Sequence, residues 1–172
     1  MTVSDYIIQF LVDRGSNVCF LLSGNGAMVL DDSIHRKMKY ICARNEAAAP
    51  VMAKAWAKLT GKLGVVCVTA GPGALNAVPG LGECWVDSTP VLILSGQVPY
   101  NVIEPNCRTF GTAGIDIIPI VKPLTKYATR LTIYNFSGLK TILEEAYYQA
   151  MTPRQGPVWF DIPLDLQGRE IS

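Results

Sequence analysis

The chain has 172 residues, of which 49% are hydrophobic and 17% charged, and its formal net charge is +1. This length suits one globular domain with a sizeable core, and the scattered basic residues indicate neither nucleic acid nor an anionic membrane as a partner. No apolar run approaches the roughly 18 residues of a membrane span, and the N-terminus lacks the features of a signal peptide. We therefore expect a cytoplasmic protein.

Helical segments alternate with short apolar runs along the chain. Helices are predicted over residues 4–14, 47–60, 74–85 and 137–151, the last with Ser137 as its N-cap. Strands are predicted for the runs VCFLL (18–22), YICA (40–43), LGVVCVT (63–69), PVLILSG (90–96) and PVWFDIP (157–163). Apolar runs without polar alternation are typical of parallel strands buried on both faces. The sequence therefore predicts an α/β fold, with a doubly wound, mostly parallel central sheet and helices on both faces, as a single domain over residues 1–172.

Two segments carry more detailed predictions. In the helix over 47–60, apolar residues at 48, 51, 52, 55, 56 and 59 share one face, Lys54, Lys58 and Lys62 fall on the opposite side, and Gly61 is expected to end the helix. Residues 97–135 have weak periodicity and are interpreted as a long connection across the sheet edge.

The spacing of the cysteines and of the histidine does not indicate a catalytic or metal-binding motif. Five single cysteines, mostly inside apolar runs, are interpreted as reduced core residues: Cys19, Cys42, Cys67, Cys84 and Cys107. His35 follows an acidic turn and is expected at the surface. No motif has metal-ligand spacing.

The residues after the apolar runs are the candidate ligand-binding positions, because ligands of such sheets bind at the carboxyl ends of the strands. Four strand ends can be identified, and they carry Gly24, then Glu46, then the turn from Gly71 to Asn76, and finally Gln97. The first turn is a poor dinucleotide fingerprint because Val29 stands where a third glycine belongs. A nicotinamide or flavin site is therefore not favoured.

Glu46 is the sharpest single signal, and two interpretations remain open for it. It lies between an apolar run and the alanine-rich segment Ala47–Ala49, where no neighbour in sequence competes with a ligand for its carboxylate. A glutamate in the first turn of a helix also stabilises the helix dipole, by up to about 1 kcal/mol. Position alone favours the dipole interpretation over a functional one.

Several longer strings extend over most of the chain. They are AKLTG (57–61), VCVTAGPGALNAVPGL (66–81), WVDSTPVLILSGQVP (85–99), IVKPLTKYA (120–128) and GPVWFDIPLD (156–165). Together with Glu46 they resemble the N-terminal, pyrimidine-binding domain of thiamine diphosphate-dependent enzymes of the acetolactate synthase-like family.

The resemblance implies a role for each candidate residue. In the family, the glutamate matching Glu46 hydrogen-bonds N1′ of the cofactor's aminopyrimidine and starts proton transfer, for which its carboxyl should be desolvated. The remaining positions would bind the cofactor or allow it to approach closely: Gly24, Gly71, Pro72, Gly73, Asn76 and Gln97. The substrate would be a 2-oxo acid, decarboxylated or joined to a second molecule.

The resemblance also implies that the chain supplies half of a site. Family enzymes hold the diphosphate through Mg²⁺ in a further domain with a Gly-Asp-Gly motif, and neither this motif nor the family's central domain is found in these residues. We therefore expect a homo-oligomer, or a partner subunit that carries the diphosphate-binding domain. Trp56, Trp85 and the small-residue helix 74–85 are expected to leave an apolar interface.

Two places depart from the family pattern. Many members have His-Glu-Gln where this chain has Asn45-Glu46-Ala47, and Gln-Glu where it has Ala113-Gly114. Because these polar groups usually face the substrate, acetolactate formation itself is in question. A non-catalytic structural or regulatory homologue, with the fold and the dimer interface retained, is the alternative hypothesis.

Overall fold

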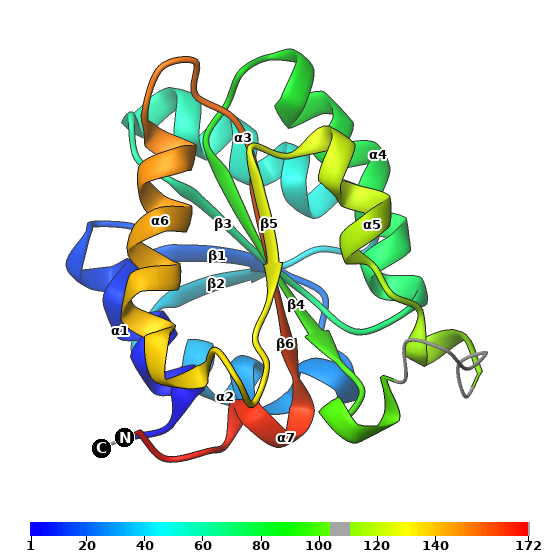
Figure 1. The fold of residues 1–172 in the computed structure, drawn as a ribbon. Coiled ribbons are helices and arrows are strands. Elements are labelled where there is room, and N and C mark those ends of the chain that lie inside the picture. The colour runs from blue at the N-terminus through cyan, green and yellow to red at the C-terminus, as the bar shows by residue number, and fades with distance from the viewer. Residues whose placement is uncertain (104–110, 172) are drawn as a thin grey trace.

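A computed structural model describes residues 1–103 and 111–171 of the chain. In this part of the chain, six parallel strands form one sheet in the order β2-β1-β3-β4-β6-β5 (Figure 1). The strands are β1 (Val18–Leu21), β2 (Lys39–Cys42), β3 (Gly64–Val68), β4 (Val91–Gln97), β5 (Tyr127–Arg130) and β6 (Val158–Pro163). The chain reverses its direction of winding between β1 and β3, which makes their carboxyl ends the topological switch point of the sheet.

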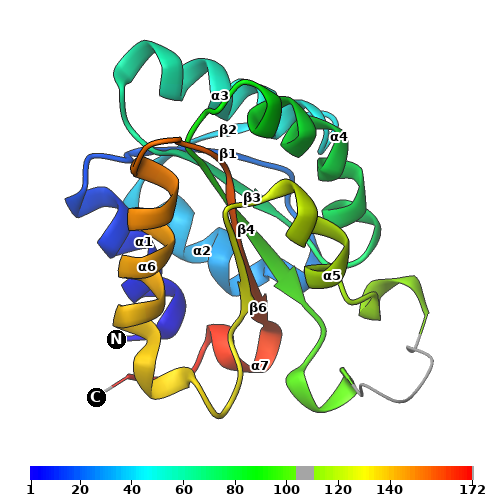
Figure 2. The same cartoon turned by 45° about the horizontal axis from the view of Figure 1, so that its top comes forward.

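Helices cover both faces of the sheet, as Figure 2 shows. One layer contains α1 (Val3–Asp13), α2 (Met28–Lys37), α6 (Leu139–Met151) and α7 (Leu164–Gln167), and the other contains α3 (Ala48–Thr60), α4 (Pro72–Val86) and α5 (Ile118–Val121). Short 3₁₀ turns lie at Asn25–Ala27, Tyr100–Val102, Thr112–Gly114, Lys122–Leu124 and Phe136–Gly138. The predicted doubly wound α/β architecture is confirmed.

The central strands are buried on both faces. In β3, Val65 and Cys67 pack into the core under α1, α2 and α6, whereas Val66 and Val68 pack into the core under α3 and α4. Every residue of β3, β4 and β6 is buried. This two-sided burial explains why these runs are continuously apolar.

The prediction of burial was wrong for the run at residues 40–43. The structure places β2 at the edge of the sheet, where among the described strands it pairs only with β1, and all four of its residues are exposed. Cys42 is therefore an exposed thiol and not a core residue, while Cys19, Cys67 and Cys84 are buried and free, as predicted. The prediction for Cys107 lies outside the described residues.

The buried face of α3 is formed by small residues. The helix buries Ala49, Ala53 and Ala57, while Val51 and Leu59 are exposed. The small residues are needed because α3 lies directly on the sheet: a Cβ added at Gly64 would stand 2.6 Å from the carbonyl oxygen of Ala53. Larger side chains would hold the helix away from β3, so they occupy the outer face.

The remaining local predictions have mixed outcomes. The helices predicted over 4–14 and 74–85 are confirmed as α1 and α4, and Gly61 ends α3 in the left-handed conformation with φ of 71°. The N-cap prediction at Ser137 was wrong, because a 3₁₀ turn precedes α6 and Gly138 takes the cap position. The predicted connection over 97–135 contains the edge strand β5, which the sequence pattern did not indicate.

Two further findings concern His35 and the hydropathy of the helices. His35 is exposed on α2, as predicted, with Nδ1 3.3 Å from the Tyr40 hydroxyl oxygen. Within residues 1–103 and 111–171, none of the helices combines the length and hydropathy of a bilayer-spanning segment.

Candidate functional site

The turns after β1 and β3 meet at the topological switch point. The backbone N–H of Gly26 donates to Thr69 Oγ1 over 2.9 Å. A Cβ added at Gly24 would lie 2.6 Å from Thr69 Cβ, closer than any side chain allows. The glycine at position 24 therefore lets the two turns pack against each other beside Thr69.

Glu46 lies in the turn between β2 and α3, immediately before the helix begins. Its side chain reaches the N-terminal part of α4, where Asn76 Nδ2 donates to Glu46 Oε2 over 3.3 Å. An added Cβ at Gly73 would stand 2.7 Å from Thr69 Cγ2 and 3.5 Å from Glu46 Oε1, so the glycine lets the start of α4 pack against Thr69 beside this oxygen. The structure thus brings together three of the predicted residues, Glu46, Gly73 and Asn76.

Gly71 and Pro72 shape the start of α4. Pro72 is exposed at the first position of the helix, which suits its fixed φ and missing N–H. Gly71 precedes it with φ of 57°, and an added Cβ would stand 2.2 Å from the carbonyl oxygen of Thr112 and 2.7 Å from the Cα of Ala113. The space at Gly71 is therefore filled by the chain's own backbone.

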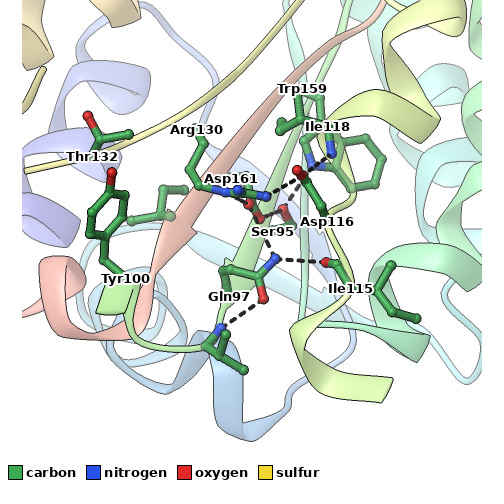
Figure 3. A network of polar contacts seen from close by, with 12 residues as sticks. Ser95, Gln97, Tyr100, Ile115, Asp116, Ile118, Arg130, Thr132, Trp159 and Asp161 are labelled. Carbon is green, nitrogen blue, oxygen red and sulfur yellow. Dashed lines mark hydrogen bonds and ion pairs between the residues drawn. The ribbon is translucent and has the colours of Figure 1, made fainter. Parts of the chain in front are cut away.

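Gln97 ends β4 and belongs to a buried polar network, shown in Figure 3. Its side chain is almost completely buried: Nε2 donates to the carbonyl oxygen of Ile115 over 3.1 Å, and Oε1 accepts from the N–H of Val98 over 2.9 Å. Nε2 also lies 3.4 Å from Asp161 Oδ2. The structure therefore places Gln97 inside the sheet end, where its side chain bonds to Ile115, Val98 and Asp161.

Asp161 is the buried centre of this network. Its Oδ1 accepts from Ser95 Oγ over 2.6 Å, and its Oδ2 accepts from Arg130 Nε over 2.6 Å. Complete burial raises the pKa of Asp161, and the guanidinium of Arg130 opposes that shift. Burial works against the charge of Arg130 too, but the carboxylates of Asp161 and Asp116 outweigh it and raise the pKa of Arg130. The two charges stabilise each other.

Sequence reasoning missed Thr69, Arg130 and Asp161 as residues of this region. Thr69 stood directly at the end of the β3 run, where a hydroxyl among glycines is a usable signal. Asp161 is a carboxylate inside the otherwise apolar run PVWFDIP, and a buried charge requires a partner. Its partner Arg130 lies on β5, the strand that the sequence pattern did not indicate.

The donor set at Glu46 fits an aminopyrimidine better than a metal ion. Among the described residues, no hydrogen bond is made to Glu46 Oε1, while Oε2 is held by an amide. The carboxylate is half-buried, and its Oε1 can form a hydrogen bond with a ring nitrogen. In residues 1–103 and 111–171, no three carboxylate, thiol or imidazole side chains cluster as metal ligands.

Comparison with known protein families identifies the chain. Residues 1–120 match the family model described as "Thiamine pyrophosphate enzyme, N-terminal TPP binding domain". The chain belongs to this family. The resemblance stated from the sequence strings is therefore confirmed, and thiamine diphosphate is the cofactor of the family.

Relatives of this thiamine pyrophosphate-binding domain are large subunits of acetolactate synthase. The protein from Lactococcus lactis subsp. lactis is 37% identical over 98% of this chain and 29% of its own length, and that from Haemophilus influenzae is 35% identical over 94% and 28%. The chain thus spans less than a third of these relatives.

A solved structure shares the fold of the domain. The thiamine diphosphate-dependent 4-hydroxybenzoylformate decarboxylase of Rhodococcus jostii RHA1 superposes with a TM-score of 0.87, covering 99% of this chain and 31% of that chain, at 24% sequence identity. This likeness confirms the fold predicted from the strand and helix pattern.

Proposed function

We propose that the chain is the aminopyrimidine-binding half of a thiamine diphosphate-dependent, acetolactate synthase-like enzyme that decarboxylates or joins 2-oxo acids. The observation that supports this proposal most is the position of Glu46. Its carboxylate is held by Asn76 next to Gly73, with no hydrogen bond to Oε1 from the described residues, at the carboxyl edge of the sheet where ligands of this fold class bind.

Each residue of this group has a distinct task in the proposal. Glu46 would hold the aminopyrimidine through a hydrogen bond to N1′ and would exchange a proton there. Asn76 holds the carboxylate in place through Oε2, and Gly73 lets the start of α4 pack closely against Thr69 beside Glu46. When bound, thiamine diphosphate supplies a thiazolium ring that serves as an electron sink for the 2-oxo acid.

The other predicted residues act around this centre. Gly24 and the turn from Gly71 to Pro72 contribute to the walls of the binding region, and Gln97 contributes from the sheet end through its contact with Ile115. Mg²⁺ and the diphosphate are assigned in this proposal to a separate diphosphate-binding domain. A cytoplasmic location is part of the same proposal.

The outer face of α3 and α4 supports a second element of the proposal, a homo-oligomer. Val51, Leu59 and Val86 are exposed on these helices, at 43%, 87% and 72%, and Trp56 and Trp85 are partly exposed beside them. Exposed apolar patches of this kind mark association surfaces. We infer that a second copy covers this face and brings a diphosphate-binding domain to Glu46.

One observation favours the alternative hypothesis of a non-catalytic homologue. Asn45 Oδ1 accepts from the N–H of Ala47 over 2.7 Å, so the side chain before Glu46 is engaged within its own turn. A residue that faced a substrate would present its polar group outward. Glu46 decides between the two hypotheses because only catalysis requires its carboxylate.

The test compares proton exchange at the thiazolium C2 in the full-length protein that contains this chain, with thiamine diphosphate and Mg²⁺. Glu46→Gln removes the exchangeable proton and should slow exchange by about 10²-fold or more. Glu144→Gln on α6, in the opposite helix layer, is the matched control and should exchange like the wild type.

Equal exchange rates in the wild type and Glu46→Gln would contradict the assigned role. Binding by residues 1–172 alone provides a second check, because half a site should bind thiamine diphosphate weakly. Dissociation constants below about 1 μM for this part alone, equivalent to more than about 8 kcal/mol, would contradict the half-site interpretation.

A further inference from the structure

The segment from Thr112 to Ile118 lies against the turn that begins α4. Its first residues rest on Gly71, since an added Cβ there would meet the carbonyl oxygen of Thr112 at 2.2 Å. The segment includes Ala113 and Gly114, two of the positions predicted to face the substrate. Whatever holds this segment therefore shapes one side of the proposed site.

Two polar links tie the segment to the end of the sheet, and both converge on Asp161. Gln97 Nε2 donates to the carbonyl oxygen of Ile115, and Arg130 Nη2 donates to Asp116 Oδ1 over 2.5 Å. Gln97 and Arg130 both also contact Asp161 Oδ2, at 3.4 and 2.6 Å (Figure 3). The fully buried carboxylate thus fixes the two side chains that reach the segment.

The use of arginine at position 130 is informative. Its Nε bonds Asp161 and its Nη2 bonds Asp116, so one rigid guanidinium connects a buried carboxylate with a half-exposed one. The bond from Arg130 Nε alone would be enough to balance the charge of Asp161. The second bond spans two separate parts of the chain, β5 and the segment before α5, and a planar fork can make both at once.

We propose that Arg130 and Asp161 are positioning residues that clamp the segment Thr112–Ile118 onto the Gly71 turn and so hold the substrate-facing wall of the site. This inference rests on the proposed function for the identity of the site. The clamp itself is a property of the chain and can be measured without cofactor.

The first experiment measures hydrogen exchange of the backbone amides in the full-length protein without cofactor. Asp116→Ala removes the outer end of the clamp and also the local bond from the N–H of Ile118 to Asp116 Oδ1, so the readout is the other amides of residues 112–118, where exchange should speed about tenfold, with β4 and β6 unchanged. The matched control is Asp32→Ala, which removes another half-exposed carboxylate paired with an arginine, on α2. Unchanged exchange over residues 112–118 in Asp116→Ala would overturn the clamp.

Arg130→Lys separates the clamp from simple charge compensation. A lysine keeps a positive charge near Asp161 but lacks the fork needed for both carboxylates. It should therefore loosen residues 112–118 as much as Asp116→Ala does, while β4 and β6 exchange as in the wild type. Wild-type exchange over the segment in Arg130→Lys would show that the fork is not needed and would overturn the assignment of Arg130.

The second experiment tests positioning with the loaded enzyme and pyruvate as the probe. Asp116→Ala should raise KM about tenfold and leave the affinity for thiamine diphosphate within about twofold, because only the substrate-facing wall moves. An unchanged KM together with faster exchange would refute the positioning role. A wild-type protein that shows no cofactor-dependent turnover would contradict the proposed function. The hydrogen-exchange data alone would then test the clamp.

Discussion

Two glycines with positive φ differ in what surrounds them, and this difference predicts different costs of substitution. Gly61 has φ of 71° with nothing within 4 Å of an added Cβ, whereas Gly71 has φ of 57° and faces the backbone of Thr112 and Ala113. Gly61→Ala should therefore cost about 1 kcal/mol of unfolding free energy from backbone strain alone. Gly71→Ala adds a steric clash with the backbone and should cost at least about 3 kcal/mol.

Urea unfolding of the two variants measures this difference. Gly61 is in the left-handed region with ψ of 11°, whereas Gly71 has ψ of −114°, so the excess cost of Gly71→Ala reports its less accessible backbone conformation together with the contact with residues 112–113. Equal costs for the two variants would mean that the segment moves aside freely at Gly71.

The residues of the candidate site show how much of it could be predicted from the sequence. Glu46, Gly73 and Asn76 could be selected because each follows a predicted strand, and parallel strands bring their carboxyl ends together. The role of Gly71 could not be predicted in this way. Its close neighbour Thr112 lies 41 positions along the chain, and only the folded structure shows that backbone, and not a ligand, fills the space.

At the scale of single elements, α3 shows that the face with the larger apolar residues need not be the one that packs on the sheet. Its larger apolar residues share one side of the helix, yet the alanines at 49, 53 and 57 form the contact with the sheet. The distance between a helix and a sheet depends on side-chain size, and Gly64 on β3 permits an unusually close approach. An apolar face on the outside then indicates a partner and not a core.

The contact between α3 and α4 is reinforced by charges that respond to acid. Lys58 and Lys54 bond Asp87 at the end of α4 over 2.7 and 2.9 Å, and they lower the pKa of Asp87 from 3.8 to about 2. The folded state therefore prefers the charged carboxylate more than the unfolded state does. This contribution to stability is present above about pH 4 and is lost as the pH falls towards 2.

Asp87→Asn should consequently lower the free energy of unfolding at neutral pH, and its difference from the wild type should shrink as the pH falls from about 4 to 2. Urea unfolding at a series of pH values measures this. In a background with both Lys54→Met and Lys58→Met, Asp87→Asn should lose its pH-dependent effect. A difference that stays constant down to pH 2 would contradict the role of these ion pairs.

At the scale of the whole molecule, the doubly wound fold could be predicted because its central strands are continuously apolar and alternate with helical segments. The two edge strands of the sheet could not be predicted in this way. The edge strand β2 is apolar in sequence but exposed, and β5 has no residue that is fully buried. An edge strand has only one neighbouring strand, so its composition reflects local surroundings that a single sequence does not specify.

The outer face of α3 and α4 predicts self-association of the whole molecule. Val51 lies on this face, and replacing it by glutamate would place a charge within the contact without disturbing the buried alanines of α3. Val51→Glu should weaken self-association at least about tenfold in sedimentation experiments, because burying an unpaired charge is costly. Tyr148→Glu on α6, exposed in the opposite layer, is the matched control and should associate like the wild type. A wild-type protein that remains monomeric at every concentration, or equal association in both variants, would show that this face is not the interface.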